Sequence, residues 1–437
     1  MSQYSIEKDE FLNTNKSIYE CFMLADSVTG ELNSDYYRAF VNAGYYTPKG
    51  RLQTSQQQVT YFSTNIFGSG NDFWDNYTAN NATIIHSPNE SAILMSVANT
   101  AGSECIRQTK QVMQYVPGRT AEFTTAFILT MPIPGIRKRI GCFDKNNGFY
   151  FEELGTATGA DYSVVLRSSV TGTPVETRVL RENWNGDKLD GTGPSGIIAT
   201  PDTIHLLMVT ADWYGAGSVQ FQFVIDGRKH VIHTFYNANR ISNAWSAIPF
   251  VPIRKELTNI SSNTAATLLS LSSAFSLDGS STSPGVAMSQ GRFNQTLATK
   301  DVFYPTVSIR MKSTALNSVN ILRRMFGRVH ATNSSWRWKI IVNAELTGAN
   351  WVPHELQNST IEVDVSATAV ANGMSVLYGI GDVGGGSIEF EASDAKSSTF
   401  QLGRSNLGAN TDTFTIAVAS TGTNDVFDTV IRWREAR

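Results

Sequence analysis

Apolar and polar residues alternate in short runs along most of this chain, and the alternation predicts strands. A period of two residues places successive side chains on opposite faces of a sheet. The runs are separated by clusters of Gly, Asn, Asp and Pro, which favour turns. Clear examples are Ser91–Val97, Ala121–Leu129, Tyr162–Arg167, Ile204–Thr210 and Val219–Ile225. No comparable run has the 3.6-residue period of an amphipathic helix.

The dipeptide Asp226–Gly227 lies between two predicted strands and is a strong signal for a two-residue hairpin. A second series of runs begins at Thr306–Met311 and ends at Val430–Trp433. Short strands joined by turn residues at this spacing are typical of sandwiches and barrels. We therefore predict an all-β protein with two β-sandwich, jelly-roll-like domains, the first over residues 51–256 and the second over residues 301–437.

Two segments depart from the alternating pattern. In residues 1–50, apolar positions follow a helical spacing over Lys16–Asp26, which predicts a short N-terminal arm with one or two short helices. The arm either docks to a partner or folds back on its own domain. Residues 257–300 are rich in Ser and Thr, with Leu268 and Phe275 among their few large apolar side chains. We expect an inserted or crossover hairpin there, either paired within the chain or exposed for a neighbouring subunit.

Composition narrows the classes of function. The chain has 437 residues, and its 35 Lys and Arg against 38 Asp and Glu give a net charge of −3. This balance supplies no basic excess for nucleic acid. The first residues lack the basic and apolar regions of a secretory signal peptide, and no apolar run reaches the ~18 residues that a membrane helix needs. We therefore expect synthesis in a cytoplasm, no nucleic-acid partner and no membrane.

The sequence offers few candidates for a metal or cofactor. The three cysteines are scattered and lack zinc-ligand spacing. His230 and His233 lie three apart on one predicted strand and therefore face opposite sides of a sheet. Asp187 and Asp190 lie in a Gly-rich loop without the alternate acceptors and late Glu of a calcium loop, so we expect them to cap turns. We predict no metal site and no cofactor.

Catalytic motifs are equally scarce. A glycosidase on a β-sandwich needs two facing carboxylates, and the acids beside predicted strands are Glu152, Glu153 and Asp212. Strand-end acids are usually solvated or paired with arginine, so we expect no catalytic residues and no enzymatic activity. The basic run Arg137–Arg139 is expected to form a solvated strand edge rather than a phosphate contact, and such an edge also discourages aggregation.

Several unusual strings follow one another along the first half of the chain. They are RQTKQVMQYVPGR at 107–119, RIGCFDKNNGFYFE at 139–152, VLRSSV at 165–170, NWNGDKLDGTGPSG at 183–196, FVIDG at 223–227 and PFVPIR at 249–254. In this order the chain resembles a family of virion structural proteins of tailed bacteriophages, with relatives in large DNA viruses of algae and protists. The resemblance covers about residues 95–255 closely and 300–345 more loosely.

The resemblance implies a component of the virus particle. Within its strings we expect turns at Gly141, Gly148 and Gly227 and a loop cap from Asp144 and Asn147. We also expect five phenylalanines to lie in the core, namely Phe143, Phe149, Phe151, Phe221 and Phe223.

The resulting functional hypothesis is a virion structural protein located in the particle. We favour a capsid-associated component, of the decoration or head-fibre type, that binds other particle proteins and forms a homo-oligomer such as a trimer. The alternative is a tail or baseplate component, or a receptor-binding adhesin that binds a host-surface glycan. The adhesin needs exposed aromatic rings, and the candidates are Trp74, Tyr77, Trp245 and Trp351.

Overall fold

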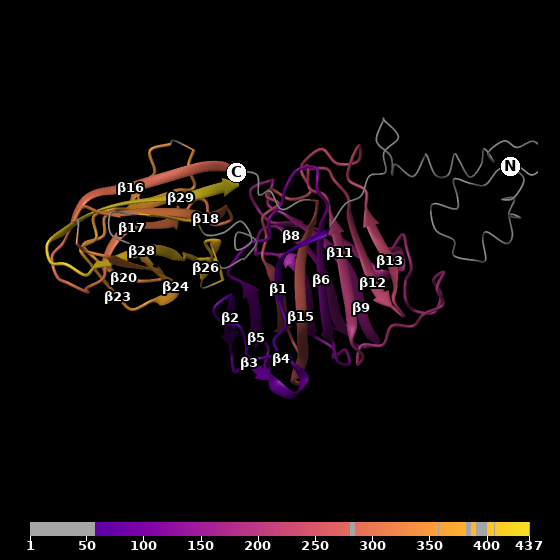
Figure 1. Cartoon of the computed structure of the whole chain (residues 1–437). Helices are drawn as coiled ribbons and strands as arrows, with labels where there is room; N and C mark the ends of the chain where they lie inside the picture. The colour runs from indigo at the N-terminus through magenta and orange to yellow at the C-terminus, as the bar shows by residue number, and fades with distance from the viewer. Residues whose placement is uncertain are drawn as a thin grey trace, which may run out of the picture. The chain divides into compact units, whose positions relative to one another are not determined.

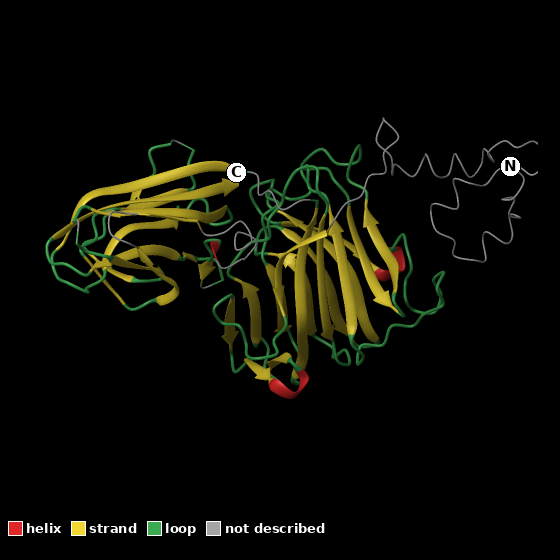
Figure 2. Cartoon of the chain, viewed as in Figure 1, coloured by secondary structure: helices red, strands yellow, loops and turns green. Residues whose placement is uncertain are grey.

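The structure is a computed structural model that describes the chain from residue 57 to residue 436. Residues 1–56, which include the predicted N-terminal arm, lie outside the described residues. Gaps inside the range fall at 280–284, 332, 357, 382–385, 390–399 and 406, and only the backbone is described for 386–389. Strands dominate the described residues, with short 3-10 helices at η1 (Pro88–Glu90) and η2 (Arg181–Asn183) (Figure 2). None of the described helices has the length and apolar character to cross a bilayer.

The first sandwich consists of two antiparallel sheets (Figure 1). The eight-stranded sheet has the order β13 (Arg228–Phe235), β12 (Val219–Ile225), β11 (His205–Ala211), β6 (Ala121–Ile128), β15 (Ala266–Asp278), β4 (Ala92–Val97) and β3 (Thr83–Ser87), with β1 (Gln57–Ser63) also paired to β15. The seven-stranded sheet has the order β10 (Val175–Leu180), β9 (Gly159–Ser168), β8 (Gly148–Thr156), β7 (Ile136–Phe143), β14 (Ile253–Asn259), β5 (Glu104–Thr109) and β2 (Trp74–Ala79).

The core of this sandwich lies between its two sheets, and the alternating pattern explains why. On β6, Phe123 and Phe127 are fully buried and Thr125 between them is also buried, while Thr124 and Ala126 are partly exposed. Four of the five predicted core phenylalanines belong to this core: Phe149, Phe151, Phe221 and Phe223. Phe143 is also buried, but it packs with Tyr150 and Val165 in a small separate cluster.

Two glycines of the sequence strings have different roles. Gly227 follows Asp226 in the hairpin between β12 and β13, and both residues have positive φ, as a type I′ turn requires. The hairpin prediction is therefore confirmed. Gly141 lies inside β7 instead of in a turn, and a Cβ there would approach the carbonyl oxygen of Phe149 to 2.2 Å. Its absence of a side chain permits close packing against β8.

The second sandwich is also built from two antiparallel sheets. The four-stranded sheet has the order β16 (Val286–Leu297), β29 (Asp425–Ala436), β18 (Val319–Val329) and β25 (Gly386–Glu389). The six-stranded sheet has the order β21 (Val352–Pro353), β22 (Ile361–Asp364), β17 (Tyr304–Met311), β28 (Thr413–Ser420), β19 (Trp336–Val342) and β24 (Met374–Gly381). Two small ladders accompany them, β20 (Glu345–Thr347) with β23 (Ala369–Ala371) and β26 (Arg404–Ser405) with β27 (Asn410–Thr411).

The second core is centred on large aromatic side chains. Trp336, Phe427 and Trp433 are each no more than 1% exposed, and the rings of Trp336 and Phe427 meet edge to face with centroids 4.9 Å apart. Large buried aromatics contribute strongly to core stability because each removes a wide apolar surface from water. The predicted all-β fold with two β-sandwiches is therefore confirmed.

Residues 257–300 contain strands of both sandwiches. The end of β14 and the whole of β15 pair within the first sandwich, where Leu268 and Phe275 are buried. β16 pairs with β29 in the second sandwich. The segment predicted as an insertion or crossover hairpin thus supplies paired strands, because its scattered leucines and phenylalanine alternate with Ser and Thr at strand period. The division of the chain into domains remains a prediction.

Candidate functional site

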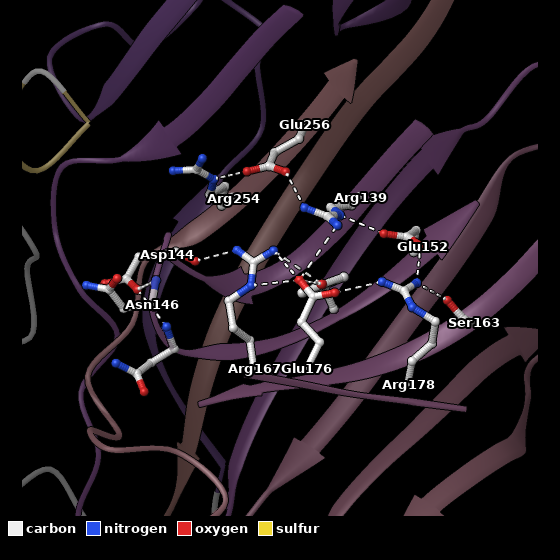
Figure 3. Close-up of polar contacts among 12 residues, drawn as sticks. Arg139, Asp144, Asn146, Glu152, Ser163, Arg167, Glu176, Arg178, Arg254 and Glu256 are labelled. Carbon is white, nitrogen blue, oxygen red and sulfur yellow. Dashed lines mark hydrogen bonds and ion pairs between the residues drawn. The ribbon is translucent and has the colours of Figure 1, made fainter. Parts of the chain in front are cut away.

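Charged side chains cover part of the outer face of the seven-stranded sheet, the face turned away from the core (Figure 3). On β7, β8 and β14 the inner positions carry mainly core residues, and the outer positions carry acids and arginines. We name this set the charged ladder, and it comprises Arg139, Tyr150, Glu152, Arg167, Glu176, Arg178, Arg254 and Glu256.

Strand register brings the centre of the charged ladder together. Arg139 on β7 lies between Glu152 on β8 and Glu256 on β14, directly opposite both in the pairing. Its Nε lies 2.6 Å from Glu152 Oε2, and its Nη1 lies 3.4 Å from Glu256 Oε2. Arg254 Nε lies 2.5 Å from the other oxygen of Glu256. Each carboxylate therefore bridges two guanidinium groups.

The other half of the charged ladder is centred on Glu176 of the edge strand β10. Arg167 Nη2 and Arg178 Nη2 contact the two oxygens of Glu176 at 2.7 and 2.8 Å. The hydroxyl of Tyr150 donates a hydrogen bond of 2.7 Å to the same carboxylate. Arg178 also contacts Glu152, which joins this half to the centre.

Burial and charge act in opposite directions on the acids of the ladder. For Glu176, burial raises the pKa, but the Tyr150 hydrogen bond and the guanidinium groups of Arg167 and Arg139 outweigh it and lower the pKa to about 2. Burial likewise raises the pKa of Glu256, and its arginine neighbours again lower it below the usual range. Both carboxylates are therefore ionised and held as hydrogen-bond acceptors at neutral pH.

The charged ladder is buried at its centre and open at one end. Glu152, Glu256 and Arg139 are each less than 9% exposed. The side chains of Glu176 and Arg178 at the sheet edge are 28% and 33% exposed. The network is therefore accessible to solvent mainly at β10.

The basic run Arg137–Arg139 is not the solvated strand edge that the sequence predicts. β7 is a central strand, paired with β14 and β8, so these side chains are flanked on both sides. Lys138 points to the inner side, where its Nζ lies 2.7 Å from buried Glu153. Burial raises the pKa of Glu153 and lowers that of Lys138. The prediction failed because the acids that pair with this run lie on other strands.

The acids considered for catalysis do not face one another. Glu152 lies in the charged ladder on the outer side of the sheet, whereas the adjacent Glu153 pairs with Lys138 on the inner side. Asp212 follows β11 in the other sheet of the sandwich. The three carboxyl groups are therefore not brought together as a pair across one groove.

A second buried amine lies on the inner side of β14. Lys255 is fully buried and donates hydrogen bonds to the hydroxyls of Ser270 and Ser273 at 2.6 and 3.1 Å. Burial, together with the smaller effect of the positive charge of Arg107, lowers the pKa of Lys255 to about 7. The strand thus carries an amine with serine partners on one face and the paired Glu256 on the other.

The Gly-rich loop and the histidines have structural contacts. Asp187 accepts hydrogen bonds from the backbone N–H groups of Leu189 and Ser195, at 2.9 and 2.8 Å. Asp190 similarly accepts from the N–H of Thr192. His233 is buried, and its Nδ1 lies 3.2 Å from the backbone nitrogen of Asn185. Within residues 57–436 as described, no three metal-ligating side chains cluster.

The aromatic candidates for glycan contact differ in exposure. Trp74 and Trp245 are buried, at 3% and 8%. Trp351 is partly buried beneath the guanidinium of Arg310, 4.3 Å from its ring centroid. Tyr77 is 44% exposed and lies on β2 of the sheet that carries the charged ladder. Of these four rings, Tyr77 is the best placed for a ligand of that sheet.

No family model matches the chain, and no curated protein matches it. Solved structures do resemble it. The CBM2 module of the evolved Dit of Lactobacillus casei BL23 phage J-1 is 9% identical, with a TM-score of 0.35 over 52% of this chain and 99% of that module. The legume lectin-like domain from Entamoeba histolytica is 11% identical, with a TM-score of 0.30 over 49% of this chain and 96% of that domain.

A third similar structure is a putative beta-glucanase from Mycobacterium abscessus, 11% identical, with a TM-score of 0.34 over 50% of this chain and 99% of that chain. Identities this low concern the fold alone. They nevertheless correct one expectation, that the chain is not an enzyme, because the solved structures similar to it include glycoside hydrolases. The exclusion drawn from missing motifs was therefore wrong.

Proposed function

We propose that this chain is a glycan-binding component of a bacteriophage particle and that the charged ladder is its binding surface. The observation that carries the proposal is the network itself. Seven charged side chains are joined on one sheet face (Figure 3), and the hydroxyl of Tyr150 is bonded to one of them, Glu176. Sugar hydroxyls both donate and accept hydrogen bonds. A surface that alternates guanidinium donors with carboxylate acceptors can therefore satisfy them in pairs.

The network is ordered by its own contacts. Glu176 accepts hydrogen bonds from Tyr150, Arg167 and Arg178. Side chains that are fixed before a ligand arrives lose little conformational entropy when it binds. Partial exposure of Glu176 and Arg178 leaves donors and acceptors accessible to an incoming sugar at the β10 edge.

Tyr77 supports the proposal from the opposite end of the sheet. It pairs with Ile106 on β5, and the same row continues to Glu256 and Arg139. Exposed rings contribute apolar area and, through a hydroxyl, a polar contact. The row thus leads from an exposed ring to the buried polar centre of the charged ladder, so Tyr77 and the open β10 edge are accessible groups at the two ends of the same sheet.

The role in a virus particle rests on the sequence strings, and those strings contain much of the charged ladder. Arg139 and Glu152 bound the string at 139–152, Arg167 lies in VLRSSV, and Arg254 ends PFVPIR. A glycan site needs access to the host surface. We therefore place a tail or fibre position, in a homo-oligomer attached to other virion proteins, ahead of the capsid-decoration hypothesis.

Binding of the purified full chain to host cell-surface polysaccharide tests the proposal. Arg178→Ala and Glu176→Gln change the exposed end of the charged ladder, and we expect at least about tenfold weaker binding because charge-assisted hydrogen bonds are lost. Arg228→Ala, at an exposed arginine of the other sheet, is the matched control and should bind normally.

Equal binding by all three variants, or no binding by the unchanged chain, would reject the charged ladder as a glycan site. Antibody labelling of intact virions in the electron microscope tests the particle role separately. Label on tails or fibres supports the proposed position, label over the head favours decoration, and absence of the protein from purified particles rejects the virion hypothesis.

A further inference from the structure

A short row of polar side chains lies on the inner face of the seven-stranded sheet, among the apolar residues of the first core. Lys138 on β7 is directly opposite Glu153 on β8, and Glu153 is directly opposite Tyr162 on β9. On its other side Lys138 is opposite Leu257 of β14, which is fully buried. We name Lys138, Glu153 and Tyr162 the inner row. None of these three residues belongs to the charged ladder, which occupies the outer face.

The amine and the carboxyl group of the inner row are in direct contact and shielded from water. Lys138 Nζ lies 2.7 Å from Glu153 Oε1, and the two side chains are 0% and 1% exposed. Lys138 Nζ also donates a hydrogen bond of 3.3 Å to the backbone oxygen of Thr130. The next inner residues along the two strands, Ile140 and Phe151, belong to the hydrophobic core. The register therefore holds an amine against a carboxyl group in a dry site.

Burial favours the uncharged forms of both groups. It lowers the pKa of Lys138 and outweighs the opposing effect of the Glu153 carboxylate. It also raises the pKa of Glu153 against the effect of Lys138, and the negative charge of Asp202 adds to that rise. A lysine amine becomes a nucleophile when desolvation removes its proton. The inner row thus favours a neutral amine beside a neutral carboxylic acid, which are the forms that can react with each other.

One carboxyl oxygen of the inner row has no hydrogen-bond partner. Glu153 Oε2 is buried and makes no hydrogen bond of ordinary geometry to any described residue. A buried ion pair is stable only when its remaining lone pairs are satisfied, so this oxygen is costly. An amide formed from the two side chains would have one oxygen instead of two. Its N–H would also find an acceptor already in place, because the oxygen of Thr130 contacts Lys138 Nζ.

The second fully buried lysine of the same sheet shows what the inner row adds. Lys255 on β14 is also buried, but it donates its hydrogen bonds to the hydroxyls of Ser270 and Ser273. Hydroxyl groups cannot condense with an amine to give an amide. Burial of an amine is therefore common to both sites, and contact with a buried carboxyl group distinguishes Lys138.

We propose that Lys138 and Glu153 condense to an amide that cross-links β7 to β8. The lone pair of Lys138 Nζ attacks Cδ of Glu153, a C–N bond forms, and the bond from Cδ to one carboxyl oxygen breaks. That oxygen leaves as water with the proton of the acid and one proton of the amine, so no oxidant or further reactant is needed. The hydroxyl of Tyr162, opposite Glu153, can donate a hydrogen bond to the departing oxygen. The cross-link goes beyond the proposed glycan binding and does not depend on it.

The intact mass of the purified full chain in denaturant tests the inference, because denaturant separates an ion pair and leaves an amide in place. After incubation of the folded chain at neutral pH, its mass should be lower by one water than the sequence requires. Lys138→Arg keeps the positive charge, but a guanidinium stays protonated and is no nucleophile, so this variant should keep its full mass. Lys255→Met is the matched control at the other buried lysine and should lose one water like the unchanged chain.

Proteolytic digestion of the unchanged chain supplies a second readout, which holds even where a variant does not fold. It should release a branched peptide that joins the segments around Lys138 and Glu153, identified by tandem mass spectrometry. Full mass of the unchanged chain, or recovery of the two segments only as separate peptides, would overturn the inference. Water loss that persists in Lys138→Arg would also overturn it, because Asp226–Gly227 can lose water by forming a succinimide. None of these outcomes depends on whether the charged ladder binds host polysaccharide.

Discussion

The two sandwiches present arginines on an outer sheet face in opposite ways. In the charged ladder, Arg139 meets Glu256 on the adjacent strand β14, Arg254 meets it from within β14, and both arginines are largely buried. On the four-stranded sheet of the second sandwich, Arg432 is exposed and lies opposite another arginine, Arg324. Buried charges need partners because removing them from water is costly, whereas exposed ones are stabilised by solvent. The first surface therefore depends on pairing within the sheet, whereas the exposed guanidinium of Arg432 is stabilised by solvent.

The largest expected effect comes from breaking the charged ladder at its centre. Glu256→Gln leaves Arg139 and Arg254 with one charged partner fewer in a buried site, and we expect a loss of about 3 kcal/mol in the free energy of unfolding. Urea denaturation measures it, with Arg328→Gln at an exposed position as the control. A loss below about 1 kcal/mol would show that the ladder contributes little to stability.

Lys255, on the inner side of β14, should make the free energy of unfolding depend on pH. Because the pKa of Lys255 in the folded chain is lowered to about 7 from 10.5, the unfolded chain binds the extra proton between these values. Stability contributed by this group therefore rises with pH from about 7 toward 10. Lys255→Met should reduce the rise between pH 7 and pH 9 by up to about 2 kcal/mol. Equal rises in both proteins, measured by urea denaturation, would contradict a buried neutral amine.

The stability that the open end of the charged ladder contributes should decrease in acid. The pKa of Glu176 is about 2 in the folded chain and 4.5 ordinarily, so its stabilising contribution is present above pH 4.5 and is lost as pH falls toward 2. Glu176→Gln should therefore lower stability at pH 6 more than at pH 3. Thermal unfolding at the two pH values measures the difference. An identical decrease in stability at both pH values would mean that the carboxylate of Glu176 does not take part in the network.

The smallest effect is expected at Arg432, which lies opposite Arg324 in the second sandwich. Arg432→Gln removes one of two opposed like charges, so stability should stay within about 0.5 kcal/mol and rise slightly at low salt. The gain should shrink as salt screens the repulsion. Urea denaturation at two salt concentrations measures it. A loss comparable to that of Glu256→Gln would mean that both surfaces are structural and would remove the contrast between them.

The local pattern of apolar, polar and turn residues was sufficient to predict much of the fold. Alternation over Ala121–Leu129 corresponds to β6, and Asp226–Gly227 forms the predicted hairpin. Asp187 caps its loop as its Gly-rich surroundings suggest. These features depend on residues close together in the chain, so a local argument reaches them.

The candidate site was harder to predict. Arg137–Arg139 and Glu152 were both singled out from the sequence, but as a solvated edge and as a strand-end acid. The ion pair between Arg139 and Glu152 depends on the pairing of β7 with β8. The second partner of Arg139, Glu256, depends on the pairing of β7 with β14, whose residues lie more than 100 positions further along the chain. A search for strands with opposite charges at matching outward positions would have found Arg139 and Glu256 as partners.

The amino-acid sequence by itself determined where strands and turns form, because side-chain alternation and turn chemistry act over a few residues. Only the tertiary structure decided which charged residues face one another. Arg139 meets two acids, whereas Arg432 meets another arginine, and nothing near either residue in the sequence distinguishes them. Register between distant strands is set by burial of whole sheets, and a shift of one residue would exchange every inner and outer side chain.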